Sequence, residues 1–419
     1  MVSCDHPDSG ETIITRIATI SHDIDFSSLH NRMAWYVDQG ILSCVNSLVM
    51  RGTDVLDFKT FGFMDMESKQ PLRDDAIYRM YSNTKIVTSV AAMQLFEQGR
   101  FTLDDPLSTV LPEFADMQVL LPDASETAHV VAAREPIRMR HILSHSAGLS
   151  YGFIEPGSVI DKSYIAAKIN ALGGDEPTLE ELCAKLAALP LAFEPGTSWR
   201  YSFATDVTAR VVEVLSGKRF DTYLQDHIFK PLGMVDTGFH VPAEKLDRFV
   251  TMYAPANLFD PMEPGMSRAE DPLTGPYSRP RRMLSGGGGL VSTVQDYLAF
   301  IRMIVNGGSW NGVTILNPDT LRLMRTNQLA PGVQVAFPMW TMPGTVFGLG
   351  FALKSSVSEK ESAMAKDEYH WGGMAGTHSW MAPNAGITGM CMTQRMPGFW
   401  HPFSHEFKAM AYQLAGRSA

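Results

Sequence analysis

The pattern of apolar and polar positions changes along the chain from strands to helices and back to strands. Residues 41–65 form two runs rich in β-branched and aromatic residues around a polar turn at 51–54, and this spacing predicts a hairpin. The segment 83–98 is apolar on nearly every side and is followed by Gly99. A helix without a polar face lies inside a fold, so this segment is predicted to be a central buried helix.

Helical periodicity and loops dominate the middle of the chain, from about Pro106 to Pro280. The clearest helices there are predicted over 178–191 and 204–218, and the second ends at Gly217, a residue typical of a helix C-cap. Strand patterns return in the last third of the chain, with helices before and after them. The predicted strands of this part cover 346–353, 376–382 and 386–394, and the predicted helices cover 296–308 and 405–416.

Strand-rich segments at both ends of the chain, with a helical segment between them, predict an α/β (α+β) fold class. We expect residues 1–105 and 281–419 to form one α/β domain together. Residues 106–280 are expected to form a mainly helical insertion domain.

Composition and charge exclude several classes of partner. The 419 residues are 45% hydrophobic and 19% charged, with a formal net charge of −10, which argues against binding to nucleic acid or to an anionic membrane. No apolar run reaches the roughly 20 residues that a transmembrane helix needs. The four cysteines are scattered without a C-x-x-C pair, so we expect neither disulfides nor a zinc site. The N-terminal segment is acidic where a signal peptide is basic and then apolar, so a cytoplasmic location is expected.

Two serines are candidates for a catalytic nucleophile. Ser150 lies in the sequence GLSYG, which matches the G-x-S-x-G pattern of a nucleophile elbow. Such an elbow needs a buried strand before it, whereas basic residues and histidines at helical spacing precede Gly148. We therefore expect Ser150 to lie in a loop, and Ser82, three positions before Lys85, becomes the better candidate.

Ser82 and Lys85 are spaced so that both side chains can share one face of the predicted central helix. A neutral lysine amine can remove the serine proton. Burial and the positive end of the helix dipole both disfavour the ammonium form, and keeping a lysine neutral at pH 7 takes roughly 4–5 kcal/mol. The free N–H groups at a helix start can also bind an oxyanion, at the amide of the serine itself.

Further motifs follow in the order of a known superfamily. Tyr201 stands two positions before Phe203 in PGTSWRYSF, just ahead of a predicted helix. The pair Gly372-Gly373 stands in HWGGMAGTHSW at the expected start of a strand. With S-N-T-K, HILSHSAGL and LSGGGGLVST, these motifs resemble those of the penicillin-recognising serine hydrolases, above all the family VIII carboxylesterases, which are similar to class C β-lactamases. The resemblance covers nearly the whole chain and implies a β-lactamase-like fold, with an antiparallel sheet flanked by helices and a mainly helical domain.

The resemblance also implies roles for individual residues. Ser82 would be the acylated nucleophile, with Lys85 as its first base and Tyr201 as the second member of the acid–base pair. Because Lys85 and Tyr201 would share a proton, neither would have a pKa of its own. The oxyanion hole would consist of the backbone N–H groups of Ser82 and Met374, the residue that follows W-G-G on the edge strand. Without the resemblance, Tyr201 would be interpreted as a core tyrosine with its hydroxyl bonded to backbone.

Two positions depart from the β-lactamase pattern and bear on the substrate. Phe203 stands where β-lactamases have the asparagine of Y-x-N, and Trp371 stands where they have the lysine of K-T-G. Loss of that amide and that cation weakens recognition of acylamino and carboxylate groups, and an indole offers an apolar face instead. Both changes favour small to medium neutral esters. The further candidates for substrate binding, some of which a packing role would explain equally well, are Gly372, Gly373, Tyr151, His378, Trp380 and Trp340.

Two histidine pairs have the i, i+4 spacing of paired metal ligands, His141 with His145 and His401 with His405. Neither pair has the glutamate of H-E-x-x-H or an obvious third ligand. The sequence therefore predicts neither a metal site nor a cofactor.

Together these features predict a serine carboxylesterase that acts on a small-molecule ester through an acyl-enzyme on Ser82. Three alternatives stay open: an acyltransferase of the same fold, a weak β-lactamase activity, and a member that binds ligand without turnover. Retention of Ser82, Lys85 and Tyr201 argues against the last, because a pure binder needs no base pair. No feature of the sequence specifies an oligomeric state.

Overall fold

The computed structural model of the chain describes residues 17–169, 176–338, 340–359 and 361–416. Cys4 and the acidic N-terminal segment lie outside the described residues. The other three cysteines are buried and free. Within the described ranges, no helix is long and apolar enough to cross a bilayer.

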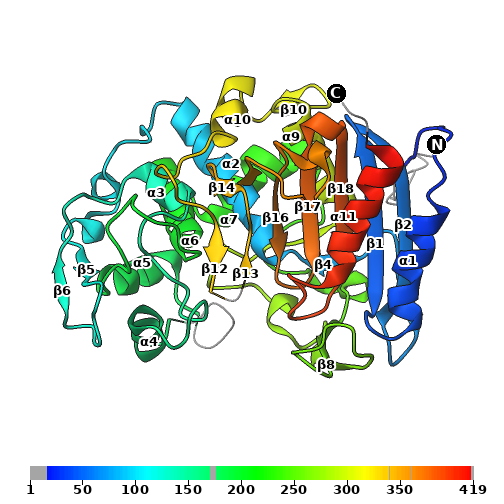
Figure 1. Cartoon of the computed structure of the whole chain (residues 1–419), viewed down its shortest axis with the longest axis horizontal. Helices are drawn as coiled ribbons and strands as arrows, with labels where there is room; N and C mark the ends of the chain where they lie inside the picture. Colours follow the sequence, from blue (N-terminus) through cyan, green and yellow to red (C-terminus); the bar gives the residue numbers. More distant parts are fainter. Residues whose placement is uncertain (1–16, 170–175, 339, 360, 417–419) are drawn as a thin grey trace, which may run out of the picture.

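An antiparallel sheet of eight strands dominates the right-hand part of the molecule in Figure 1. Its strand order is β14-β15-β16-β17-β18-β1-β2-β3, so that β18, from the C-terminal third of the chain, pairs directly with β1. The predicted hairpin is the pair β1 and β2. The strands of the sheet are β1 (Cys44–Arg51), β2 (Asp54–Asp65), β3 (Gln70–Pro71), β14 (Thr345–Phe347), β15 (Ala352–Lys354), β16 (Tyr369–Gly373), β17 (Thr377–Ala382) and β18 (Ile387–Met392).

Helices α1 (Ser27–Asp38) and α11 (Pro402–Ala415) pack side by side against one face of this sheet (Figure 1). Their apolar side chains form a core with residues of β1, β17 and β18, and this core includes Tyr36, Trp380 and Phe407. The apolar side chains of these two helices therefore cover this face of the sheet.

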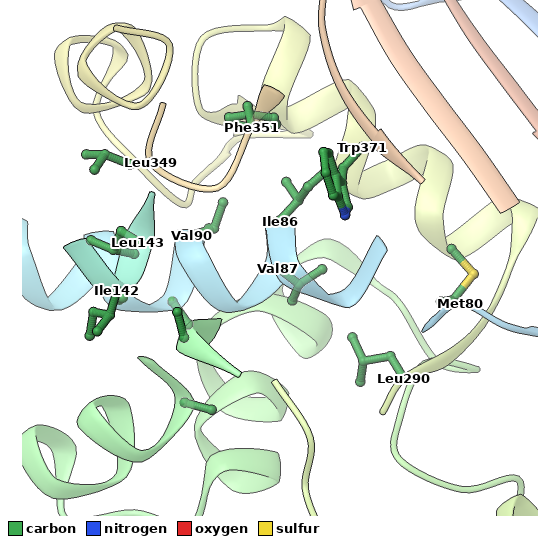
Figure 2. Packing of buried hydrophobic residues seen from close by; sticks show 14 of the residues in the cluster. Met80, Ile86, Val87, Val90, Ile142, Leu143, Leu290, Leu349, Phe351 and Trp371 are labelled. Atoms are coloured by element: carbon green, nitrogen blue, oxygen red, sulfur yellow. The ribbon is translucent and has the colours of Figure 1, made fainter. Parts of the chain in front are cut away.

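Helix α2 (Thr84–Glu97) lies on the opposite face and is buried over most of its length. Figure 2 shows Ile86, Val87 and Val90 of α2 in the largest core cluster, which also contains Trp371 of the sheet. Because the helix has no polar face, it is stable only when enclosed, and it lies between the sheet and the helical part of the chain.

The helical part of the chain occupies the left of Figure 1, and its helix α6 packs against α2. Helix α6 ends as predicted at Gly217, which adopts a left-handed conformation with φ of 68°. The helices after α2 are α3 (Met139–Leu143), α4 (Val159–Ala166), α5 (Leu179–Ala187), α6 (Ala204–Ser216), α7 (Phe220–Leu224), α8 (Lys230–Leu232), α9 (Val294–Val305) and α10 (Pro318–Met324).

Short elements connect these helices and strands. The strands outside the large sheet are β4 (Ile77–Arg79), β5 (Gln118–Leu120), β6 (Val130–Ala132), β7 (Met252–Pro255), β8 (Met266–Glu270), β9 (Val291–Thr293), β10 (Ser309–Trp310), β11 (Val313–Thr314), β12 (Ala336–Phe337) and β13 (Trp340–Thr341). The tight 3₁₀ or π turns are η1 (Tyr81–Asn83), η2 (Leu107–Thr109), η3 (Pro112–Phe114), η4 (Gln225–Phe229), η5 (Ala243–Arg248), η6 (Pro276–Ser278), η7 (Ala363–Ala365) and η8 (Pro383–Ala385).

The W-G-G motif differs in place from the prediction. Gly372 and Gly373 end strand β16 instead of starting a strand, and Met374 lies in the turn to β17. Strand β16 is also not an edge strand, because β14 and β15 lie outside it. Strand β15 pairs only with Tyr369 and His370, however, so the W-G-G half of β16 extends past it.

His378 and Trp380 point away from the α2 side of the sheet, because side chains alternate along a strand. Between them, Ser379 donates a hydrogen bond to Asn83 next to α2 (Oγ to Oδ1, 3.2 Å). Trp380 stacks instead on Tyr412 of α11, with 5.2 Å between ring centroids. Their packing agrees with the alternative interpretation of these two residues, and a role for them in substrate binding stays a prediction.

Trp380 covers Gly389 of β18, which gives a test of this packing. A Cβ atom on Gly389 would lie 2.2 Å from the Trp380 ring, so Gly389→Ala should displace the indole and lower the free energy of unfolding by about 1–3 kcal/mol. The matched control is Gly157→Ala, where a Cβ meets nothing within 4 Å. Urea unfolding followed by tryptophan fluorescence measures both, and equal midpoints for the two variants would contradict this account.

Candidate active site

Ser82 is the middle residue of the tight turn η1, directly before α2, and Lys85 lies in the first turn of α2. Ser82 Oγ lies 3.1 Å from Lys85 Nζ and 2.6 Å from the phenol oxygen of Tyr201. The indole N–H of Trp371 donates to that same phenol oxygen over 3.1 Å. The structure thus brings together four of the residues that the sequence singled out.

Tyr201 is held in place by rings on several sides. Its ring centroid lies 5.0 Å from that of His145, 5.1 Å from that of Tyr151 and 5.2 Å from that of Trp371. Contacts of this kind restrict both torsions of a tyrosine side chain, so the hydroxyl is fixed beside Ser82.

Burial sets the protonation of the two groups beside Ser82. It lowers the pKa of Lys85 to about 7, against the opposing effect of the Asp206 carboxylate. Burial also raises the pKa of Tyr201, although its hydrogen bonds with Ser82 and Trp371 oppose that shift. Near neutral pH, Lys85 is therefore the group that is partly uncharged and able to accept a proton, whereas the Tyr201 phenol keeps its proton.

The glycine run 286–289 fixes the amine of Lys85. The Gly287 carbonyl accepts a hydrogen bond from Nζ over 2.6 Å, and the Gly286 carbonyl accepts one from Thr88 Oγ1 over 2.8 Å. Glycine is required at 287 because a Cβ there would lie 2.5 Å from Asp206 Oδ2 and 2.6 Å from Tyr151 Oη. Gly286 and Gly287 thus form a tight spacer between α2 and α6.

Ser82 faces a cavity of about 90 Å³. Tyr151 and Phe203, predicted as substrate-binding residues, line it, and so does Met374. A Cβ on Gly373 would lie 2.3 Å from the Met80 carbonyl oxygen, so this glycine lets β16 approach the turn that carries Ser82. The assignment of the oxyanion hole to the amides of Ser82 and Met374 stays a prediction.

A second hollow of about 550 Å³ lies beyond Trp371. Its lining shares no residue with that of the first cavity. The predicted pocket residues Trp340, Gly372, His378 and Trp380 belong to this second lining. These residues do not line the cavity at Ser82, whereas Trp371, which also borders the second hollow, reaches the Ser82 site through Tyr201.

Ser150, the rejected serine, is fully buried in a polar network. Its hydroxyl donates to the Asp161 carboxylate and accepts from Arg200 Nε over 2.8 Å, and Arg200 also pairs with Asp161 over 3.0 Å. These contacts give Ser150 a structural role in the loop before α4.

His141 and His401, one from each histidine pair, are buried and bond to other groups of the protein. Burial lowers the pKa of both His141 and His401 to about 4, which keeps their rings neutral. His141 accepts a hydrogen bond from the Arg138 amide, and His401 bonds to the Pro261 carbonyl. Across the described ranges, no group of three or more His, Cys, Asp or Glu side chains could hold a metal ion.

Sequence reasoning missed Asp206, whose carboxylate lies in α6 and is completely buried. Its Oδ1 accepts from Ser285 Oγ over 2.6 Å and from the Gly287 amide over 3.1 Å. A signal was present in the sequence, because Phe203 and Ala209 stand three positions to either side and place this acid on the apolar face of the predicted helix.

Comparison with known proteins gives consistent matches. Residues 31–409 match the family model described as Beta-lactamase. Esterase EstB of Burkholderia gladioli is 30% identical across 88% of this chain and 91% of its own length. Lovastatin esterase of Penicillium rubens is 30% identical across 73% of this chain and 76% of its own length. The solved structure of "EstCE1, a hydrolase with promiscuous acyltransferase activity" is 26% identical and superposes with a TM-score of 0.78, over 92% of this chain and 97% of EstCE1. The resemblance and the fold class inferred from the sequence are confirmed.

The tight contact at Gly287 generates a prediction. Gly287→Ala should push the Gly287 carbonyl away from Lys85 and slow phosphonylation of Ser82 by a fluorophosphonate probe about 10²-fold, because small displacements of reacting groups are costly. Gly288→Ala is the control, since its Cβ would meet no atom closer than 3.7 Å and should leave the labelling rate nearly unchanged. Equal labelling of both variants and the wild type would disprove the spacer role of Gly287.

Proposed function

Because the chain belongs to the β-lactamase family, we propose that it is a carboxylesterase of the family VIII type, which hydrolyses small to medium neutral esters through an acyl-enzyme on Ser82. The chain is a serine hydrolase of the β-lactamase-like fold. One observation carries the finer proposal. Ser82 Oγ, at the wall of a cavity, lies within hydrogen-bond distance of both a partly neutral lysine and a tyrosine hydroxyl.

In the acylation step, Lys85 accepts the Ser82 proton while Oγ attacks the ester carbonyl. The low pKa of the buried amine supports this assignment over a Tyr201 phenolate. The amides of Ser82 and Met374 would bind the oxyanion, in the manner of other acyl-transfer enzymes.

Collapse of the tetrahedral intermediate requires a proton for the departing alcohol. Tyr201 lies 2.6 Å from Ser82 Oγ and supplies this proton, which it recovers from Lys85. Water then attacks the acyl-enzyme, and the same two groups act in reverse order. The proton is shared across the pair, so the pH dependence belongs to both groups together.

The groups at the cavity wall favour a neutral ester as the substrate over one that carries a carboxylate. The indole N–H of Trp371 is already engaged by Tyr201 and is not free to bind a substrate carboxylate. The Arg281 guanidinium at the cavity wall forms an ion pair with Glu176, which cancels its charge. Phe203 adds an apolar surface where an amide would be needed for an acylamino group.

A matched pair of variants, Ser82→Ala and Ser150→Ala, tests the proposal with p-nitrophenyl acetate and butyrate. We expect Ser82→Ala to abolish turnover and to keep the wild-type melting temperature, because it removes only the nucleophile. Ser150→Ala should keep the ester activity but lower stability by about 1–3 kcal/mol, because it leaves partners in a buried polar network unsatisfied. Loss of activity in Ser150→Ala with an active Ser82→Ala would reverse the assignment of the nucleophile.

Acyl transfer is the second candidate function, and the similarity to EstCE1, a hydrolase with promiscuous acyltransferase activity, favours it. Both reactions pass through the same acyl-enzyme and differ only in the acceptor. With p-nitrophenyl butyrate and increasing 1-propanol, we expect butyrate to stay the main product, with propyl butyrate as a minor one. Propyl butyrate in excess at low alcohol concentration would identify an acyltransferase instead.

A further inference from the structure

We propose that Asp206 is a positioning residue for Lys85, which fixes the peptide that binds the amine and stabilises the ammonium formed when Lys85 takes the proton of Ser82. This inference rests on the function proposed above. It adds to the Ser82, Lys85 and Tyr201 group a carboxylate that touches neither the substrate nor the nucleophile.

A continuous hydrogen-bond path joins the acid to the amine. Asp206 Oδ1 accepts the N–H of Gly287 over 3.1 Å, and the carbonyl of the same glycine accepts from Lys85 Nζ over 2.6 Å. Ser285 Oγ donates to the same carboxylate oxygen over 2.6 Å and holds it in place. The position of the Gly287 carbonyl, and with it that of the amine, therefore depends on Asp206.

The second carboxylate oxygen has no such anchor. Asp206 Oδ2 is buried, and it has no hydrogen-bond partner among the residues that the structure describes. A buried acceptor left in this state is costly unless nearby positive charge compensates it. Burial raises the pKa of Asp206, whereas the charge of Lys85 and the hydrogen bonds from Ser285 and Gly287 oppose that rise and favour the carboxylate. Asp206 in turn raises the pKa of Lys85 against burial.

The other titratable groups around the pair stay neutral. Tyr151 and Tyr201 have their ring centroids 5.2 and 4.5 Å from Lys85 Nζ, and burial raises the pKa of each phenol. Burial lowers the pKa of His145, and Lys85 lowers it further. On α5, burial raises the pKa of the Cys183 thiol, and the Asp206 charge adds to that rise. The charge next to Lys85 is therefore that of Asp206.

The proton balance of acylation shows where this charge matters. The O–H bond of Ser82 breaks, an N–H bond forms on Lys85, and Oγ bonds to the carbonyl carbon. A positive charge appears on Nζ and a negative charge on the carbonyl oxygen, while Asp206 stays ionised. In this low-dielectric site the fixed carboxylate stabilises the new ammonium without reorganisation. When Lys85 returns the proton through Tyr201 to the leaving alcohol, the amine is neutral again.

The test is the pH dependence of kcat/KM and of the rate at which a fluorophosphonate labels Ser82. In the wild type both should rise as the pH passes about 7, because Lys85 must be neutral to accept a proton. In Asp206→Asn, the pH at which the rate rises (the limb of the profile) should be lower by about one unit, since loss of an opposite charge lowers the pKa of an amine. The plateau above the limb should fall about tenfold, because the amine becomes a weaker base.

Two further variants separate a positioning role from a merely structural one. Ser285→Ala keeps the carboxylate but removes a donor that favours its ionised form, so it should move the limb in the same direction by a smaller amount. Asp296→Asn replaces another buried acid, on α9, and should leave the limb in place.

An unmoved limb in both Asp206→Asn and Ser285→Ala, whatever the loss of rate, would overturn the proposal. Should Asp206→Asn not fold, the shift in Ser285→Ala decides the question alone. Labelling that follows this pattern in a protein without ester turnover would sink the esterase function and keep the role of Asp206.

Discussion

Lys85 stands at the start of α2 with its amine withdrawn from water, and the surrounding structure meets the demands that this burial creates. The amine needs an acceptor for its N–H bonds, which the Gly287 carbonyl supplies. It needs a helix that can be enclosed on all sides, which the apolar sequence of α2 provides. It also needs a negative group that compensates the positive charge formed on the amine during the proposed reaction, and the buried Asp206 is joined to the amine through Gly287. Loosening any of these contacts would let water reach the amine and return its pKa toward the usual range.

A single indole does two tasks in this site. Trp371 packs in the core beside α2 and directs its N–H to the hydroxyl of Tyr201. In the β-lactamase motif that this position resembles, a lysine would instead present a cation to the substrate. Replacing that cation by an indole moves the polar contact from the substrate to the acid–base pair. The fixed position of Tyr201 and the proposed preference for neutral esters are thus both attributed to one residue.

Sequence alone was sufficient for the long elements and for the grouping of the candidate catalytic residues. The apolar segment after Ser82, the hairpin before it and the helix that ends at Gly217 have strong local patterns, and each is observed. Short motifs in a fixed order carry Ser82, Lys85 and Tyr201, and the structure brings these three side chains together. The direction of a side chain was harder to predict. His378 and Trp380 were expected near Ser82, but strand alternation turns them toward α11. Asp206 was missed because a lone acid in a helix has no motif, and its partners come from a loop about 80 residues further along.

The pairing of β1 with β18 has a consequence for how this protein is made. Asn46 lies opposite Met392, so the sheet cannot close until the ribosome has released the chain past β18. Until then β1 presents an unpaired edge, and the core between α2 and the sheet lacks the wall that contains Trp371. Contacts between such distant parts of a sequence form slowly and leave apolar surface exposed meanwhile. A nascent chain of this protein therefore exposes apolar surface until β18 has emerged, and Lys85 acquires its buried, weakly basic amine only after the wall that contains Trp371 is in place.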